Sequence, residues 1–371
     1  MHTLAAKSSY WELILEYLIE YSIFLAKAAT IVVAIVIVVG AIAATGSKQK
    51  KLGKKGSLKV TRLNDHIDEL RDTLRQSVLD KDDLKLVYKE KKKQDKADQK
   101  DRKAQLKLKQ ESEGEMKEYR KKRVYVLNFK GNIAADAIAS LREEITAVLL
   151  MAEKQDEVIL RLESPGGMVH AYGLASSQLL RVKSEKIPLT ICVDKVAASG
   201  GYMMACLADK LVAAPFAIIG SIGVLVQLPN FHRVLKKYDV DYEQISAGEY
   251  KRTLSTFGEI TQKGRDKVQE DVENIHDIFK HWVKDHRPSI EIDKISTGET
   301  WVGTQAKERY MVDEIKTSDE CIIHACDDAE VFEVEYELKK SFQDKLGRML
   351  EESTARLFSR WFERSTDKFY Q

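Results

Sequence analysis

The stretch LTICVDKVAASGGYMMACL, residues 189–207, shows how the central part of the chain is expected to fold. Its first five residues are apolar or β-branched, which is typical of a buried strand. Small residues and paired glycines follow, and an apolar segment of helical character begins at Ser199. A buried strand that leads at once into an apolar helix is the building unit of a sheet covered by helices.

The same alternation continues on both sides of this stretch. Further strand-like runs occupy residues 124–129, 158–162, 211–213 and 222–226. Helical periodicity covers residues 136–152, 172–183 and 261–286. Strands that alternate with helices predict an α/β domain with a largely parallel sheet.

Composition divides the 371 residues into five parts. We expect an interfacial amphipathic helix, a transmembrane anchor, a charged helical or coiled-coil stalk, the α/β domain, and a C-terminal strand with an amphipathic helix that serves assembly. Their boundaries are residues 1–21, 22–46, 47–122, 123–330 and 331–371.

The anchor is predicted from an uncharged run at residues 28–45. Eighteen helical residues span about 27 Å, which is close to the hydrocarbon thickness of a bilayer. A cleaved signal peptide is the alternative, because Ala41-Ile42-Ala43 resembles a cleavage site. The preceding segment is long and carries three glutamates, so we favour an uncleaved anchor.

The charge of the chain is nearly balanced, since 60 Lys and Arg residues against 58 Asp and Glu residues give a net charge of +2. This balance gives no support to a nucleic-acid partner. The stalk mixes acidic with basic residues, which indicates a solvated helix rather than a nucleic-acid arm. No metal site is expected, because the spacing of the cysteines is typical of free thiols: Cys192, Cys206, Cys321 and Cys326.

Two glycine-rich turns could carry chemistry. Ser164-Pro165-Gly166-Gly167 follows the run at 158–162 and could present backbone N–H groups to a cleft, as an oxyanion hole requires. An ordinary strand-to-helix turn is the alternative. Ser199 stands at the start of a helical segment, where it could be either a helix cap or a nucleophile.

A nucleophilic serine needs a base. Among the eight histidines only His170 lies near either turn, and it has no evident acidic partner. Lys251, after a strand-like run at residues 242–245, is the other candidate. A lysine acts as a base only when neutral, so desolvation must lower its pKa by about three units from about 10.4. Spacing alone does not select Lys251.

Five motifs in this order resemble the signal peptide peptidase A family. They are SPGG at Ser164, ASGGY at Ala198, GSIGV at Gly220, GEYK at Gly248 and WVGTQA at Trp301. The resemblance covers residues 123–315 by motif, and the architecture of the whole chain is similar to the short SohB-type branch. One departure is Tyr310, which stands where the family often has a glycine in a turn.

The resemblance implies a ClpP/crotonase-like domain with repeated ββα units and a membrane-anchored serine endopeptidase that works through an acyl-enzyme. Its nucleophile matches Ser199, its base matches Lys251, and Ser221 is implied to orient the lysine amine. Its oxyanion donors correspond to the N–H groups of Gly166 or Gly167 and of Gly200. It also implies peptide or protein substrates, such as remnant signal peptides, and a homo-oligomeric ring, for which we expect eight copies. No cofactor and no ATP are implied.

Two other functions are compatible with the sequence. A catalytically silent membrane scaffold would use the charged segment and the terminal helix to assemble partners. An acyl-CoA enzyme is the second, because crotonase-like folds bind acyl-CoA, although fold alone does not establish function. The serine and lysine motifs and the anchor favour the peptidase.

The resemblance and the predicted anchor place the chain in the bacterial inner membrane. The side of the domain is predicted in opposite ways by two arguments. Basic residues crowd the segment after the anchor, and the positive-inside rule then makes the domain cytoplasmic: Lys48, Lys50, Lys51, Lys54 and Lys55. The family resemblance implies the periplasm. We favour the cytoplasmic side, because the charge argument comes from these residues.

Overall fold

The computed structural model describes residues 56–111 and 120–338, together with six residues between positions 21 and 30. The chain divides into two compact units, and the unit Leu58–Glu337 contains nearly all of the described residues. The predicted interfacial helix, anchor and C-terminal helix lie almost wholly outside them. Within the described residues, no helix is both long and apolar enough to cross a membrane.

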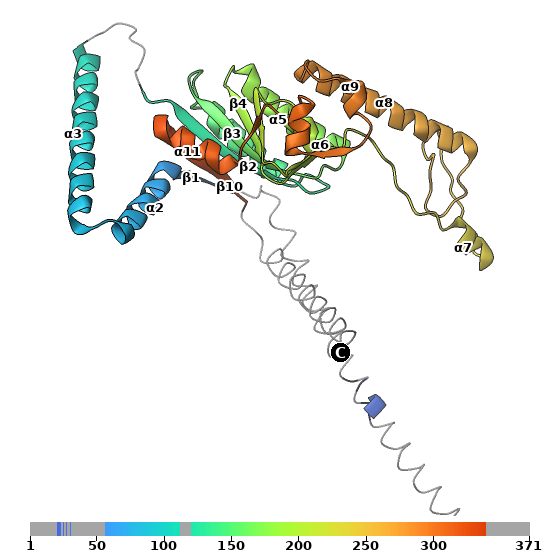
Figure 1. Cartoon of the computed structure of the whole chain (residues 1–371). Coiled ribbons are helices and arrows are strands. Elements are labelled where there is room, and N and C mark those ends of the chain that lie inside the picture. The colour runs from blue at the N-terminus through green and yellow to red at the C-terminus, as the bar shows by residue number, and fades with distance from the viewer. Residues whose placement is uncertain are drawn as a thin grey trace, which may run out of the picture. The chain divides into compact units, whose positions relative to one another are not determined.

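A seven-stranded sheet forms the centre of this unit (Figure 1). Five neighbouring pairs, from β10 through β2, β3, β4 and β6 to β9, are parallel. The predicted α/β class with a largely parallel sheet is therefore confirmed. In spatial order the strands are β1 (Ser57–Arg62), β10 (Glu330–Glu337), β2 (Arg123–Lys130), β3 (Glu157–Glu163), β4 (Leu189–Val193), β6 (Lys210–Ala213) and β9 (Glu314–Ile315).

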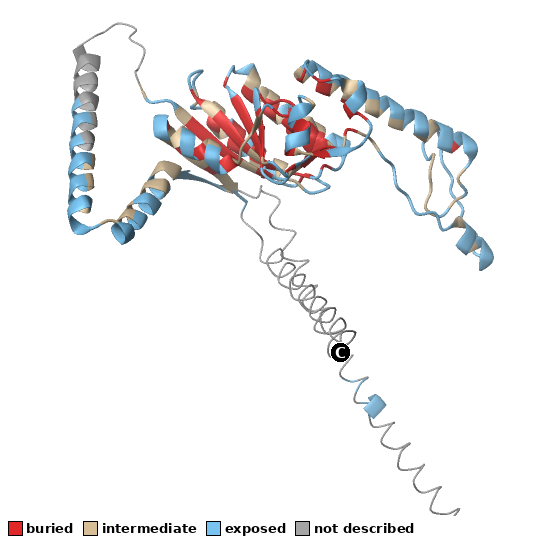
Figure 2. Cartoon of the chain, viewed as in Figure 1, coloured by how far each residue is buried: buried red, intermediate tan, exposed pale blue. Residues whose placement is uncertain are grey.

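Alternate residues of the large sheet face two separate apolar cores. Tyr125 and Leu127 belong to one core, whereas Val124 and Val126 belong to the other. Because helices cover both faces, the strands read as continuous apolar runs, and Figure 2 shows the buried residues gathered along them. The helices beside the two cores include α4 (Ile138–Leu149), α5 (Val169–Ser184), α6 (Gly200–Ala205), α2 (Leu63–Val78) and α11 (Ser318–Asp328).

A second sheet of three short strands carries the candidate site. Strand β5 (Val196–Ala198) pairs in parallel with β7 (Ile218–Gly220), which pairs antiparallel with β8 (Thr300–Val302). An isolated bridge between Ser164 and Ala197 joins the end of β3 to β5. Strands of three residues are too short to show a period of two, so the sequence did not predict this sheet.

The first part of the charged segment packs on the α/β unit. Leu63 and Ile67 of α2 contact the second core, and the Asn64 side chain accepts a hydrogen bond from the Val331 N–H at 2.8 Å. The long helix α3 (Lys81–Glu111) lies against α2 through a Lys91–Asp72 ion pair of 2.9 Å. The expected helices are present, and β1 adds an edge strand before them.

Two strand predictions are wrong. Residues 222–226 and 242–245 contain no strand. Ile222 is fully buried, but Leu225 and Ile245 are 72% and 91% exposed, and no neighbouring strand is recorded for either segment among the described residues. All of these residues except Ile222 and Gly223 belong to residues 224–260, called the arm below, which contains α7 (His232–Lys237) and lies beside α8 (Gln262–His286) in Figure 1. Two short helices follow α8, namely α9 (Ile292–Ile295) and α10 (Gly303–Glu308).

Candidate active site

Ser199 occupies a strained turn between β5 and α6. Its φ is 51° and its ψ is −120°, which is a conformation that residues with a side chain rarely adopt. The Ser199 N–H donates to the Gly220 carbonyl oxygen at 2.8 Å, and its carbonyl oxygen accepts from the Met203 N–H at 3.0 Å. These hydrogen bonds keep Ser199 in its unfavourable backbone conformation. A strained residue that its surroundings hold in place is typical of a functional position.

The three-stranded sheet places Ser221 beside Ser199. Ala198 and Gly220 are paired in register, so the two serines follow paired residues of neighbouring strands. Ser221 also has a positive φ, 54°, and its N–H donates to the Glu299 carbonyl oxygen at 2.6 Å. Both serine residues are half-buried.

The Ser-Pro-Gly-Gly turn lies directly against Ser199. A Cβ added to Gly166, whose φ is +89°, would stand 2.8 Å from Ser199 Cβ and 2.7 Å from the Ala198 carbonyl oxygen. Only glycine fits both this conformation and this space. Ser164 fixes the start of the turn, because its N–H donates to the Val196 carbonyl oxygen at 2.8 Å.

The backbone N–H groups around Ser199 differ in whether they already donate a hydrogen bond. Gly166 N–H donates to Ser164 Oγ at 3.1 Å. Within the part of the chain that the structure describes, no acceptor is recorded for Gly167 N–H or Gly200 N–H. Of the three predicted oxyanion donors, these two are available.

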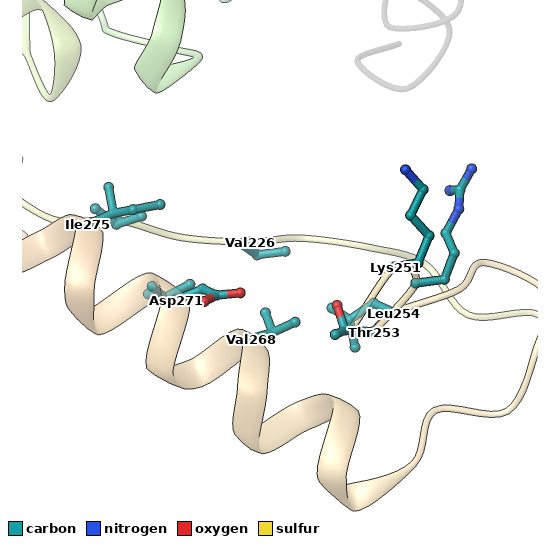
Figure 3. A pocket seen from close by; sticks show the side chains of 10 residues that line it. Val226, Lys251, Thr253, Leu254, Val268, Asp271 and Ile275 are labelled. Atoms are coloured by element: carbon teal, nitrogen blue, oxygen red, sulfur yellow. The ribbon is translucent and has the colours of Figure 1, made fainter. Parts of the chain in front are cut away.

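Lys251 lies apart from the serines. It is exposed in the arm and borders a cavity of about 330 Å³ against α8 that Val226, Val268 and Ile275 also line (Figure 3). Figure 3 shows its side chain pointing away from α8. Among the described residues, no contact between Lys251 and Ser199 is recorded.

The position of α8 accounts for this separation. Phe279 and Val283 are buried in the core that contains Leu127, and Trp282 Nε1 donates to the Met203 carbonyl oxygen of α6 at 3.0 Å. Val268, beside Lys251, precedes Phe279 by about three helical turns, or about 16 Å. The alternative base His170 is exposed on α5, and none of the contacts recorded among the described residues joins it to Ser199.

Two features near Ser199 were missed by the sequence reasoning. The Tyr172 ring packs against Gly200, where an added Cβ would stand 2.4 Å from Tyr172 Cγ. The Tyr172 hydroxyl lies 2.5 Å from Ser164 Oγ, and both residues are fully buried. A tyrosine in a helical apolar pattern gives no sign of such a contact, because it depends on how two helices meet.

Two family profiles match the chain. The first is Peptidase family S49 N-terminal over residues 16–179, and the second is Peptidase family S49 over residues 181–332. The chain belongs to peptidase family S49. Gly167 falls in the first matched region of this S49 peptidase, and Ser199 and Lys251 fall in the second.

Full-length relatives identify the branch. The chain is 47% identical over 357 residues to "Probable protease SohB" of Haemophilus influenzae, which covers 95% of this chain and 99% of that protein. It is 41% identical over 336 residues to "Putative protease SohB" of Buchnera aphidicola subsp. Baizongia pistaciae, with 88% and 93% covered. "Protease 4" of Haemophilus influenzae is 30% identical over 213 residues, which cover 54% of this chain and 34% of that protein. The chain is thus an S49 peptidase of the SohB type, and the family resemblance is confirmed.

Proposed function

We propose that this S49 peptidase is a serine endopeptidase with Ser199 as nucleophile, Lys251 as base and Ser221 as the group that orients the lysine amine. The observation that carries the proposal is Ser199 itself, which is held in a strained turn beside two N–H groups for which no acceptor is recorded among the described residues. The parallel sheet with a small second sheet is consistent with the expected ClpP/crotonase-like fold.

The reaction follows from these roles. Neutral Lys251 takes the proton of the Ser199 hydroxyl as its oxygen attacks a peptide carbonyl carbon. Negative charge develops on the carbonyl oxygen, and the N–H groups of Gly167 and Gly200 stabilise it. The protonated lysine then gives its proton to the leaving amine as the peptide bond breaks. Water, deprotonated by Lys251, hydrolyses the acyl-enzyme and restores Ser199.

The exposure of the arm favours a dyad that is formed between two copies of the chain. Within one chain Lys251 is exposed and apart from Ser199, so a base in this position needs a second surface. The arm also exposes many large apolar side chains, which single soluble domains rarely leave uncovered. They include Leu225, Val226, Leu228, Phe231, Val234, Tyr238, Val240, Tyr242, Ile245, Tyr250 and Phe257. We propose that the arm docks on a neighbouring copy in a ring and there brings Lys251 to the Ser199 of that copy.

Membrane attachment and substrates belong to the same proposal. Residues 22–46 would anchor the chain in the bacterial inner membrane, and the lysines that follow favour a cytoplasmic domain. Peptides left in or near the membrane, including remnant signal peptides, are the proposed substrates. Neither a cofactor nor ATP enters the reaction.

Fluorophosphonate labelling of the full-length protein in detergent tests the proposed function. An activated serine attacks the probe, so we expect labelling of the wild type, with the adduct located at Ser199 by mass spectrometry. Ser199→Ala should remove the label and the peptidase activity together. A folded wild type that cleaves peptides without labelling, or a Ser199→Ala variant that keeps its activity, would contradict the proposal. Full biological function in Ser199→Ala would instead favour the scaffold.

A further inference from the structure

Three hydrogen bonds run in series behind the Ser-Pro-Gly-Gly turn. Gly166 N–H donates to Ser164 Oγ at 3.1 Å, Ser164 Oγ lies 2.5 Å from Tyr172 Oη, and the Tyr172 hydroxyl donates to the Asn132 carbonyl oxygen at 2.8 Å. The Tyr172 hydroxyl has one hydrogen, which Asn132 receives, so Ser164 must donate to Tyr172. Each donor hydrogen in the series is therefore committed to one acceptor, and the direction of all three hydrogen bonds is fixed.

The two hydroxyls of this series are sealed from water. Ser164 and Tyr172 are both 0% exposed. Gly131 closes the space around the two hydroxyls, since an added Cβ would stand 2.4 Å from Tyr172 Oη and 2.7 Å from Ser164 Oγ. Burial raises the pKa of Tyr172 above its ordinary value, against the lowering effect of the Ser164 hydrogen bond, so the hydroxyl stays protonated at neutral pH. In such a dry site, losing one hydroxyl leaves a buried partner unpaired.

The same tyrosine also contacts the second half of the site. An added Cβ at Gly200 would stand 2.4 Å from Tyr172 Cγ and 2.8 Å from Tyr172 Cβ, so the root of the ring lies against the Gly200 backbone. The Tyr172 side chain thus contacts Gly200, the residue after Ser199. Through its hydrogen bond to Ser164 it also holds the turn that contains Gly167.

We propose that Tyr172 is a positioning residue that sets the two oxyanion-binding N–H groups, of Gly167 and Gly200, relative to each other. Its ring locates Gly200, and its hydroxyl locates Gly166 and therefore the N–H of the next residue. This inference rests on the proposed function, because it assumes that these two N–H groups bind the oxyanion. It adds a residue that neither touches the substrate nor transfers a proton.

The test compares Tyr172→Phe with Tyr202→Phe in the full-length protein in detergent. Tyr202 is a matched control, since it is also 0% exposed and its hydroxyl donates to the Met311 carbonyl oxygen at 3.0 Å, away from the turn. Each variant loses one buried hydroxyl and keeps its ring. The probes are a peptide aldehyde with an apolar terminal residue and the corresponding peptide alcohol. Both fill the same subsites, but only the aldehyde forms a bond with Ser199 Oγ and places an oxyanion on the N–H groups.

The ratio of aldehyde to alcohol affinity isolates oxyanion stabilisation from substrate binding. We expect Tyr172→Phe to lower this ratio and kcat by about tenfold or more, with KM and the pH profile of kcat/KM nearly unchanged because the base is untouched. Tyr202→Phe should shift the Tm by about as much as Tyr172→Phe does, but it should leave the ratio of aldehyde to alcohol affinity within about twofold of the wild type.

Ser164→Ala supplies a second variant, in case Tyr172→Phe does not fold. It removes the link between the tyrosine and Gly166 and should lower the ratio to a similar extent. A wild-type ratio in either folded variant would overturn the inference and leave the proposed function standing. A wild type in which Ser199 neither binds the aldehyde nor labels with a fluorophosphonate would overturn the proposed function, and the inference with it.

Discussion

The Ser199 N–H donates to the Gly220 carbonyl oxygen at 2.8 Å, and this bond continues the pairing of β5 with β7 by one residue. It fixes the distance between the strand that ends at the nucleophile and the strand that ends at Ser221. The small sheet, rather than helix α6, therefore sets how the two serines face the space between them.

Ser221 is expected to matter less for turnover than Ser199. In the proposed reaction it orients the lysine amine, so Ser221→Ala removes a hydrogen bond and leaves nucleophile and base in place. We expect kcat to fall by about 10- to 100-fold, against near-complete loss in Ser199→Ala. Steady-state cleavage of one peptide by both variants measures this difference. Equal losses in the two variants would give Ser221 a more direct role than orientation.

Gly200 and Gly173 make a matched pair of helical glycines. An added Cβ at Gly200 meets Tyr172 Cγ at 2.4 Å, whereas one at Gly173 of α5 meets nothing within 4 Å in the part of the chain that the structure describes. Gly200→Ala should therefore lower the free energy of unfolding by about 1–3 kcal/mol through overpacking and displace the Gly200 N–H. Gly173→Ala should raise it by about 0.5–1 kcal/mol, because alanine favours helix. Chemical denaturation of both variants checks the signs, and a Gly200→Ala variant as stable as the wild type would show that α5 and α6 do not meet closely.

Glu144 predicts a pH dependence of stability. It is 5% exposed, its Oε1 accepts the Tyr336 N–H at 2.8 Å, and its Oε2 is buried with no hydrogen-bond partner among the described residues. Burial, with a smaller effect of Glu335, raises its pKa from 4.5 to about 7, against the lowering effect of the Tyr336 hydrogen bond. The folded protein holds this proton more tightly than the unfolded chain, so the free energy of unfolding should fall as the pH rises from 4.5 to about 7.

Glu144→Gln tests this dependence, since its amide oxygen can still accept the Tyr336 N–H but has no proton to lose. Relative to the wild type, we expect little change near pH 5 and a gain of up to about 3 kcal/mol near pH 8. The exposed neighbour Glu143, changed to Gln, is the control and should leave the pH profile as it is. Parallel profiles for Glu144→Gln and the wild type would contradict the assignment.

Much of the fold was predictable because its strands are buried on both faces. Apolar runs such as those of β3 and β4 stand out in the sequence, and so do the helices between them. Residues 222–226 and 242–245, most of which lie in the arm, were predicted as strands because they have the apolar composition of a strand, but no partner strand is recorded for them among the described residues. The conformation of such a segment depends on the surface that packs against it, and a single sequence does not reveal that surface.

The site was predicted in part. Motifs brought out Ser199, Ser221 and the glycine turn, and the structure places these residues together. The choice between Gly166 and Gly167 as donor depends on the Ser164 side chain, which takes the Gly166 N–H. The separation of Lys251 from Ser199 depends on the course of α8 and the arm, for which no local pattern codes.

Mixing two inactive variants tests the central claim, a Ser199–Lys251 dyad formed between neighbouring copies, most directly. Full-length Ser199→Ala and Lys251→Ala, carrying different tags, are co-expressed, and the mixed oligomers are purified through both tags. Each variant alone should be inactive. In a mixed ring some sites combine the Ser199 of one variant with the Lys251 of the other, so activity should return to about a quarter of the wild-type value at equal, random mixing. Mixed oligomers as inactive as either variant alone, or a Lys251→Ala variant with near wild-type activity by itself, would contradict the claim.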